Sequence, residues 1–170
     1  MHIVLIAAIS ENRVLGKNNE LPWSLPADEA HLRAQIQQGW LLTGRKSFET
    51  PQGNQLFADR SDVLVLTNRL NYAPSGVQVV HGLEAAFAKA EAAGAERLNV
   101  LGGAKVYDQT LPFADELILT EVHTVIDGDA YFPEIPRTVW EEVRREDHPA
   151  DADNPYPYSF VWYRKKPVVS

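Results

Sequence analysis

Hydrophobic positions in this chain cluster into short apolar runs separated by polar or amphipathic stretches. Residues 3–9 read Ile-Val-Leu-Ile-Ala-Ala-Ile, a continuous run typical of a strand covered on both faces. Comparable runs predict further strands, at 40–43, 62–67, 77–80, 98–101 and 116–122. Residues 83–94 are rich in Leu, Ala and Glu and end in glycine, which predicts a helix. The alternation indicates an α/β fold with a central, largely parallel twisted sheet flanked by helices.

The pattern changes after Leu111-Pro112. Residues 139–145 and 158–164 look like two strands joined by an acidic, proline-rich loop at 149–157. Because no helix separates them, we expect an antiparallel C-terminal hairpin at one edge of the sheet. No internal repeat or low-complexity tract interrupts the chain. The length predicts a single domain over residues 1–170.

Residues 19–36 contain the most informative segment. Pro26 suits the first turn of a helix, which we expect to continue to about Gln38, with Gly39 as its stop. Asp28, Leu32 and Ile36 are spaced by four and share one face of that helix. The apolar members of this face predict that it turns inward, so Asp28 becomes a carboxylate near the core and near Trp23.

Two interpretations of Asp28 follow. An acid in the first turn complements the helix dipole and has no further role. Alternatively, the acid binds a ligand. Burial of a carboxylate without a partner costs roughly several kcal/mol, and no Lys or Arg shares its face of the helix. A ligand with paired N–H donors would satisfy it. The residues alone leave both open.

Composition narrows the functional classes. The chain has a net charge of −7 and no cysteine, so a general nucleic-acid binder and thiolate or disulfide chemistry are not expected. No apolar run reaches membrane-spanning length, which predicts a cytoplasmic protein without membrane contact. The five histidines are scattered, and zinc-protease, serine-hydrolase and P-loop motifs are absent, so no metal is expected.

Two glycine-containing turns follow predicted strands. Gly44-Arg45-Lys46-Ser47 combines a glycine, two cations and a hydroxyl, a combination that suits a phosphate group. Gly102-Gly103 lies between a strand and a helix, where it could admit a pyrophosphate or simply form a tight turn. The polar stretch 16–20 precedes Leu-Pro-Trp and is either a lid or an ordinary turn.

Seven blocks of sequence, in matching order and spacing, make the chain resemble the bacterial dihydrofolate reductases from Ile3 to about Lys165. The blocks are Leu-Ile-Ala-Ala-Ile, Leu-Pro-Trp-x-Leu-Pro-Ala-Asp, Thr-Gly-Arg-Lys-Ser-Phe-Glu, Leu-Thr-Asn-Arg, Leu-Gly-Gly-Ala-Lys-Val-Tyr, Leu-Thr-Glu-Val and Asp-Gly-Asp-Ala-Tyr-Phe-Pro. The resemblance implies NADPH-dependent reduction of 7,8-dihydrofolate to 5,6,7,8-tetrahydrofolate by a monomer that also binds antifolate inhibitors. The family usually has a cis peptide between the paired glycines, which are Gly102 and Gly103 in this chain.

The resemblance also implies roles for individual residues. Asp28, Trp23 and Leu21 are the expected catalytic residues. The pterin would be framed by Ile6, Ala7, Asp28, Leu32 and Thr120, with Thr120 hydrogen-bonding the acid. Arg60 would bind the α-carboxylate of the substrate's glutamate tail. The nicotinamide would lie among Ala8, Ile9, Val14, Gly16 and Leu21. The rest of NADPH would contact Gly44, Arg45, Lys46, Ser47, Thr67, Asn68, Arg69, Leu101, Gly102, Gly103, Ala104, Lys105, Val106 and Tyr107, with Arg45, Thr67, Asn68 and Arg69 at the 2′-phosphate.

The chain departs from the family pattern in two places. Residues 51–59 differ in sequence and length from the usual approach to the tail-binding arginine, which weakens the assignment of Arg60. Pro155 and Pro157 stiffen the late loop that lies beside the lid in the family. Two rivals remain: a related NADPH reductase of riboflavin or pterin synthesis, and a catalytically silent nucleotide-binding module. Neither gives a reason for Asp28 beside Leu-Pro-Trp.

Overall fold

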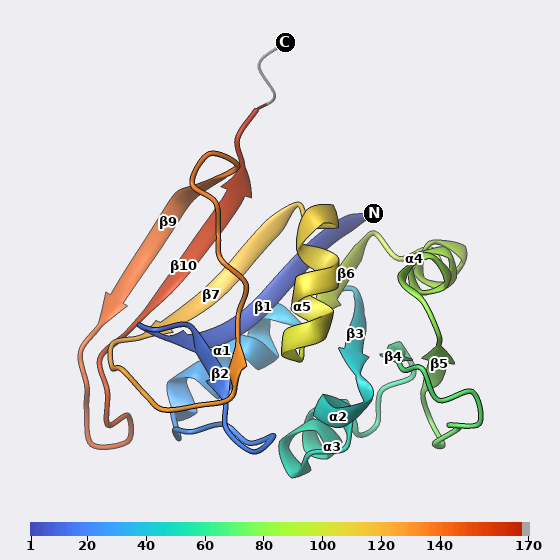
Figure 1. Ribbon diagram of the computed structural model, residues 1–170, viewed down its shortest axis with the longest axis horizontal. Coiled ribbons are helices and arrows are strands. Elements are labelled where there is room, and N and C mark those ends of the chain that lie inside the picture. Colours follow the sequence, from blue (N-terminus) through green and yellow to red (C-terminus); the bar gives the residue numbers. More distant parts are fainter. Residues whose placement is uncertain (168–170) are drawn as a thin grey trace.

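The computed structural model describes residues 1–167 and contains one eight-stranded sheet that runs through the whole molecule (Figure 1). Its strand order is β5-β4-β3-β6-β1-β7-β10-β9. The five pairings from β5 to β7 are parallel, whereas β10 is antiparallel to both β7 and β9. The strands are β1 His2–Ser10, β3 Trp40–Gly44, β4 Val63–Leu66, β5 Gln78–Val80, β6 Arg97–Val100, β7 Glu116–Val122, β9 Trp140–His148 and β10 Tyr158–Lys165. The predicted parallel sheet with an antiparallel C-terminal hairpin is confirmed.

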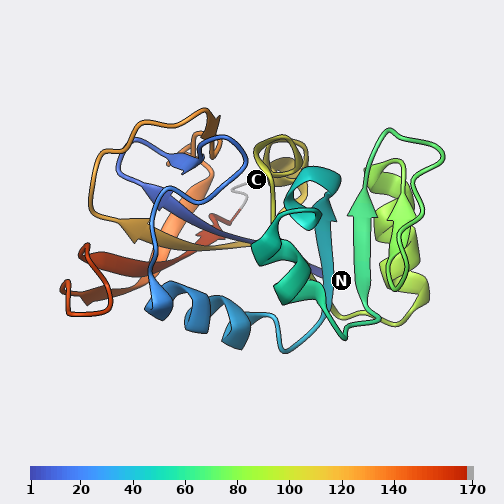
Figure 2. The same cartoon turned by 90° about the horizontal axis from the view of Figure 1, so that it is seen from below.

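Helices cover both faces of the sheet (Figure 2). On one face, Ile36, which directly follows α1, and Phe57 of α3 pack against alternate residues of the strands, such as Val4 and Val65. On the other face, α4 and α5 cover the intervening residues, such as Leu5. This double cover is the physical reason why the central strands are apolar throughout. The helices are α1 Pro26–Gln35, α2 Arg45–Phe48, α3 Pro51–Phe57, α4 Leu83–Ala92 and α5 Ala104–Thr110, followed by a 3-10 turn, η1 Leu111–Phe113.

Helix α1 ends earlier than the sequence predicts. Its last residue is Gln35, and Ile36 closes it by donating its N–H to Leu32 O over 3.1 Å. The expected end at about Gln38 is therefore wrong. Gly39 has a φ of +88°, and a Cβ there would lie 2.5 Å from the carbonyl oxygen of Arg97. The glycine thus belongs to a tight entry into β3, and the chain must leave the helix before it.

The short elements α3, β2 (Val14–Gly16) and β8 (Ala130–Tyr131) were not predicted. In α3, Thr50 caps the helix by accepting a hydrogen bond from the N–H of Gly53, and Pro51 occupies the first turn. A separate two-stranded sheet joins β2 to β8. Each is too short to produce a hydrophobic period that could be recognised in the sequence.

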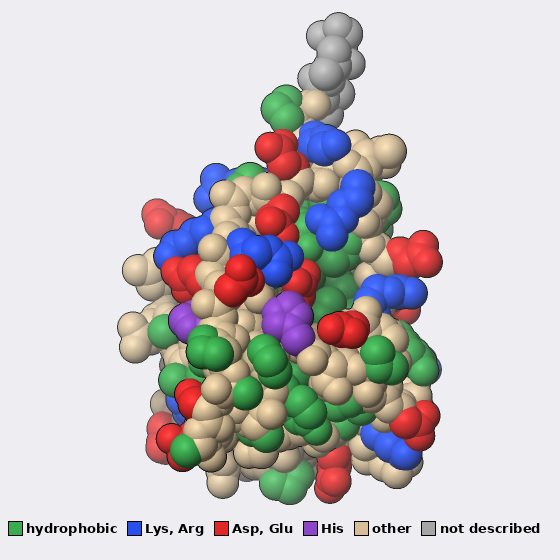
Figure 3. All heavy atoms as spheres, turned by 90° about the vertical axis from the view of Figure 1, so that its left-hand side faces the viewer, with side chains coloured by type: hydrophobic (Ala, Val, Ile, Leu, Met, Phe, Trp, Pro, Cys, Tyr) green, Lys and Arg blue, Asp and Glu red, His purple; other side chains and the backbone are tan. Residues whose placement is uncertain are grey.

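The outer strand β9 carries charges of both signs along the free edge of the sheet. Arg145 bonds to Glu142 and to Glu121 of β7, and Arg144 lies over the Trp162 ring. Figure 3, which faces this side, shows acidic and basic side chains interspersed over it. Such charges discourage edge-to-edge pairing of strands. None of the helices within residues 1–167 combines the length and apolar character needed to cross a membrane.

Candidate active site

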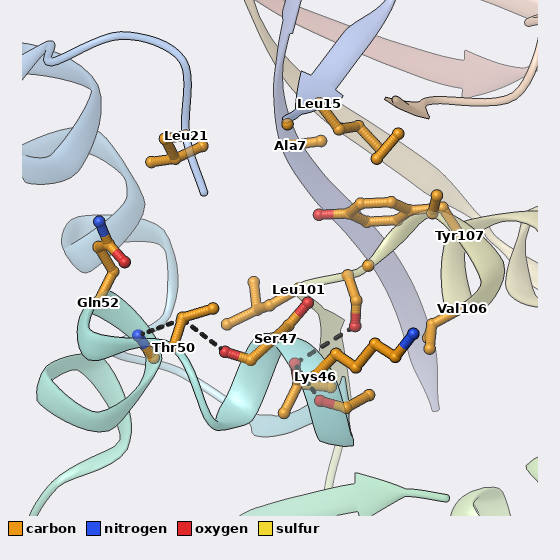
Figure 4. Close-up of a pocket in the computed structure, with 18 of the residues that line it drawn as sticks. Ala7, Leu15, Leu21, Lys46, Ser47, Thr50, Gln52, Leu101, Val106 and Tyr107 are labelled. Carbon is orange, nitrogen blue, oxygen red and sulfur yellow. Dashed lines mark hydrogen bonds between the residues drawn. The ribbon is translucent and has the colours of Figure 1, made fainter. Parts of the chain in front are cut away.

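A cleft of about 1150 Å³ opens at the carboxyl ends of the parallel strands β1, β3 and β6. The loops and helices that follow these strands form its walls, which is the usual position of a ligand site in an open α/β sheet. Figure 4 shows Leu21 and Gln52 on one side, Val106 and Tyr107 on the other, and Leu101 between them. The volume exceeds the range of about 300–1,000 Å³ common for a single small ligand, so the cleft has room for two.

Asp28 lies on the wall of this cleft, in the first turn of α1. Thr120 Oγ1 on β7 donates a hydrogen bond to Asp28 Oδ1 over 2.6 Å. Among the described residues, no basic side chain forms an ion pair with this carboxylate. Burial raises the pKa of Asp28 to about 6, an effect that the Thr120 bond partly opposes and the charge of Glu29 reinforces. A carboxylate that has one hydrogen bond within the protein and also lines a cavity suits a ligand with N–H donors.

Trp23 and Tyr107 line the same cleft as Asp28. Trp23 is 8% exposed, and its Nε1 lacks a hydrogen-bond partner within the described part of the chain. An indole N–H at a cavity wall is therefore available to a ligand or a bridging water. Tyr107 Oη donates to Ile6 O over 2.5 Å, and burial, then the charge of Asp28, raises the pKa of its hydroxyl.

The two glycine-containing turns meet at the other end of the cleft. Gly44 donates its N–H to Gly102 O over 2.7 Å, and the peptide between Gly102 and Gly103 is cis. A Cβ on Gly102 would lie 3.2 Å from the Tyr107 ring, and one on Gly103 would lie 3.1 Å from Ser47 Oγ. Both positions are therefore too crowded for a side chain, and the two glycines present backbone to the cavity.

Cations surround this glycine-lined end. Lys46 and Lys105 line it from α2 and α5, and Arg45 joins them while bonding to Glu49 over 2.5 Å. The backbone N–H groups that begin α5 have no acceptor within the helix. Amide donors together with three positive side chains are groups that suit the binding of a phosphate chain.

The cleft brings together most of the residues predicted from the sequence. Those on its wall are Ile6, Ala7, Ala8, Gly16, Leu21, Trp23, Asp28, Leu32, Gly44, Arg45, Lys46, Ser47, Thr67, Asn68, Leu101, Gly102, Gly103, Ala104, Lys105, Val106 and Tyr107. Ile9, Val14 and Thr120 lie in the buried layer behind the wall. Arg69 is exposed outside it, where its N–H donates to Thr67 Oγ1.

Arg60 is engaged within the protein. Its guanidinium binds Asp62 through Nε and Nη2, at 2.9 and 2.8 Å. Nη1 donates to Ile36 O over 2.8 Å, and Nη2 donates to Gly39 O over 3.3 Å. Arg60 thus ties the C-terminal end of α1 to the start of β4 and does not line the cleft.

The 17–20 turn reaches from one side of the cleft to the other. Lys17 and Glu20 exchange both backbone hydrogen bonds, and Asn18 and Asn19 between them have positive φ angles of 52° and 62°. Asn19 Nδ2 donates to Lys46 O over 3.1 Å. On the opposite side, Asn18 N donates to Asp129 Oδ2 over 3.0 Å. The stretch is a tight turn, and it is also anchored on both walls of the cavity.

Several residues of the cleft were not predicted from the sequence. His81 and Gly82 follow β5, and Gln52, Gly53 and Leu56 come from α3. His81 Nδ1 lies 2.8 Å from Thr67 O, which requires a proton on that nitrogen because a carbonyl only accepts. The Thr50-Pro51 helix start could have indicated α3, whereas no local signal marks His81.

Comparison with known proteins identifies the family. A sequence model of the family described as dihydrofolate reductase matches residues 2–165. The chain belongs to the dihydrofolate reductase family. Its relatives include the dihydrofolate reductase of Neisseria gonorrhoeae, 36% identical over 98% of this chain and 99% of that protein. The dihydrofolate reductase of Bacillus subtilis is also 36% identical, over 96% of this chain and 95% of that protein.

The fold of this dihydrofolate reductase-family chain also matches a solved structure. That structure is dihydrofolate reductase from Enterococcus faecalis complexed with NADP(H) and RAB-propyl, with a TM-score of 0.85 and 31% sequence identity. The match covers 98% of this chain and 97% of that one. The parallel sheet and the antiparallel hairpin are thus shared over nearly the whole length.

Proposed function

We propose that the cleft reduces 7,8-dihydrofolate to 5,6,7,8-tetrahydrofolate with NADPH, the reaction of its family, and that Asp28 binds the pterin. The observation that carries this assignment is the hydrogen bond of 2.6 Å from Thr120 to Asp28 on the cavity wall, with no ion-pair partner for the acid among residues 1–167. A buried acid costs stability unless a ligand completes it. The helix-dipole interpretation gives no reason for its burial.

The residues at the glycine-lined end fit NADPH. Gly44, Gly102 and Gly103 line the cleft with backbone alone, while Arg45, Lys46 and Lys105 supply positive charge. We assign the cofactor phosphates to this group, and the 2′-phosphate to Arg45 with Thr67, Asn68 and Arg69. When bound, NADPH supplies the hydride.

The protein's contribution is position and electrostatics. Above a pH of about 6, Asp28 carries a charge and accepts hydrogen bonds from paired N–H donors, which orients and polarises the ring. Leu21 and Leu32 give the same cleft an apolar lining, and a less polar environment strengthens that interaction. The Trp23 N–H is free to hold a water molecule beside the ring. We propose that water delivers the proton to the substrate.

The chain is proposed to act as a monomer. Asp28 and Thr120, whose hydrogen bond carries the proposed assignment, belong to the same chain. A sedimentation or light-scattering measurement tests this. Activity that requires association of two chains would contradict it.

Substitution of Asp28 by Asn tests the role of the acid. Turnover, followed as loss of NADPH absorbance with dihydrofolate, should fall by about two or more orders of magnitude at neutral pH, since the shape stays and the charge is lost. NADPH affinity should stay within about twofold, because the cations lie at the other end of the cleft.

Glu29→Gln is the matched control, because Glu29 lies in the same helical turn and pairs with Arg33 over 3.3 Å. The helix-dipole interpretation predicts small and similar effects for both substitutions, about 0.3–1 kcal/mol of stability each. Unimpaired turnover of the Asp28→Asn variant at neutral pH would overturn the assignment.

A further inference from the structure

The N-terminal turn of α1 has an incomplete set of hydrogen bonds of its own. Leu25 is the N-cap residue and has no side-chain oxygen to offer. Pro26 has no N–H, and the N–H groups of Asp28 and Glu29 both reach Leu25 O, at 3.0 and 3.2 Å. The N–H of Ala27 therefore has no acceptor within the helix. This donor precedes Asp28 by a single residue.

A distant loop supplies the missing acceptor. Asn154, in the connection between β9 and β10, accepts the N–H of Ala27 on its Oδ1 at 3.1 Å. Its residue is 5% exposed. Figures 1 and 2 both show this connection beside the start of α1. An amide oxygen here does what Ser, Asp or Asn normally does from the N-cap position itself.

The orientation of the Asn154 amide is fixed from its other side. Asn154 Nδ2 donates to Asp151 Oδ1 over 3.0 Å, and the same oxygen accepts the backbone N–H groups of Asp153 and Asn154 at 2.9 and 2.8 Å. Asp151 N in turn donates to Asn154 O over 2.9 Å. Since a carboxylate only accepts, the amide nitrogen must face Asp151 and the oxygen must face Ala27.

We propose that Asn154, held by Asp151, is a positioning residue that caps α1 from outside and sets the placement of Asp28. The path is short: Asn154 fixes Ala27, and the next residue places its carboxylate against Thr120. Ala27 also packs in the cluster that contains Trp23 and Tyr158. Without the cap, the first turn frays and the carboxylate gains access to water. This inference rests on the proposed function of Asp28.

A double-mutant cycle with Asp28 tests the proposal. Asn154→Ala alone should lower turnover about three- to tenfold at neutral pH. This factor is the free energy of one helix cap converted into a change of rate. In the Asp28→Asn background the same substitution should change turnover by less than about twofold, because the group it positions is gone. A residue that only stabilises the fold would lower the rate by the same factor in both backgrounds.

A second readout does not depend on activity. In the ligand-free protein, the titration midpoint of Asp28, followed by carboxyl carbon NMR, should move toward the ordinary aspartate value in Asn154→Ala, because water reaches the acid. The groups that surround Asp28 are Thr120, Glu29, Tyr107 and Tyr158, and none of them is altered. An unchanged midpoint would contradict the proposal.

Two further variants complete the experiment. Asp153→Ala is the matched control, because the loop bonds described here use its backbone N–H and not its side chain; turnover and midpoint should stay at the unmodified values. Asp151→Ala removes the group that orients the amide and should shift both readouts in the direction of Asn154→Ala, which keeps the test decisive if that variant does not fold. Turnover by the unmodified protein is measured first. Its absence would refute the proposed function, whereas additive effects in the cycle would refute the positioning role alone.

Discussion

Asp28, on the wall of the cleft, lowers the stability of the folded protein at neutral pH. Its pKa of about 6 in the folded protein is above the ordinary value of 3.8, so the folded state holds a proton that the unfolded state releases between these pH values. The free energy of unfolding must therefore decrease as pH rises from about 4 to about 6. The shift corresponds to about 3 kcal/mol at neutral pH. A ligand that donates to the carboxylate would recover part of this cost.

Asp28→Asn should consequently stabilise the ligand-free protein at pH 8. We expect a gain of about 1–3 kcal/mol, since the neutral amide accepts the Thr120 hydrogen bond without the cost of a buried charge. Near pH 4, where Asp28 is mostly protonated, the gain should largely disappear. Urea unfolding at both pH values measures this. A variant that is less stable than the unmodified protein at pH 8 would support the helix-dipole interpretation instead.

At the scale of single elements, the sequence indicates where helices begin better than where they end. Pro26 predicts the start of α1, and the four-residue spacing of Asp28, Leu32 and Ile36 predicts its inward face. The end could not be predicted, because Gly39 is required by the approach of Arg97 from β6, a contact between residues far apart in sequence. The small β2–β8 sheet depends in the same way on a pairing across more than a hundred residues.

In the candidate site too, residues with a local sequence pattern were predicted, whereas residues placed by contacts between distant parts of the chain were not. Residues that follow a strand in a recognisable block, such as Lys46 and Lys105, reach the cleft as expected because parallel strands bring their carboxyl ends together. Arg60 follows an altered segment and bonds within the protein. Asn154 caps a helix more than a hundred residues earlier in the chain. Neither arrangement leaves a local pattern in the sequence.

Helix α1 should depend on Arg60 at its C-terminal end. Arg60→Ala removes the bonds to Ile36 O and Gly39 O and leaves Asp62 without its partner, so unfolding free energy should fall by about 1–3 kcal/mol. Arg33→Ala, which removes a mostly exposed arginine of the same helix, is the control and should change it by about 0.5 kcal/mol or less. Equal losses in the two variants would show that Arg60 does not hold the helix end.

The same variant tests the proposed contact with the substrate's tail. If Arg60 also pairs with the tail carboxylate, Arg60→Ala should weaken dihydrofolate binding by about 1.5–3 kcal/mol. A pterin without the glutamate should bind with unchanged affinity. If both ligands weaken alike, the effect comes from displacement of α1, and the tail carboxylate is bound elsewhere.

At the scale of the whole molecule, a local group of positive side chains contrasts with the negative net charge. The chain carries a net charge of −7, yet Arg45, Lys46 and Lys105 gather on one end of the cleft. For an anion to bind there, short-range attraction to these side chains and to backbone N–H groups would have to outweigh the repulsion that the molecule exerts at longer distance. A cofactor with an additional phosphate gains more from such a cluster than one without it.

Cofactor preference should therefore be visible in the stability of the entire fold. NADPH at about one hundred times its dissociation constant should add about 2.7 kcal/mol to the free energy of unfolding. For a chain of 170 residues this raises the melting temperature by about 5–10 °C. NADH at the same concentration should raise it much less, because no 2′-phosphate meets Arg45.

Arg45→Ala should reduce the NADPH shift toward the NADH shift, whereas Lys89→Ala, on the exposed side of α4, should leave it unchanged. Equal thermal shifts with the two cofactors in the unmodified protein would contradict the assignment of Arg45 to the 2′-phosphate.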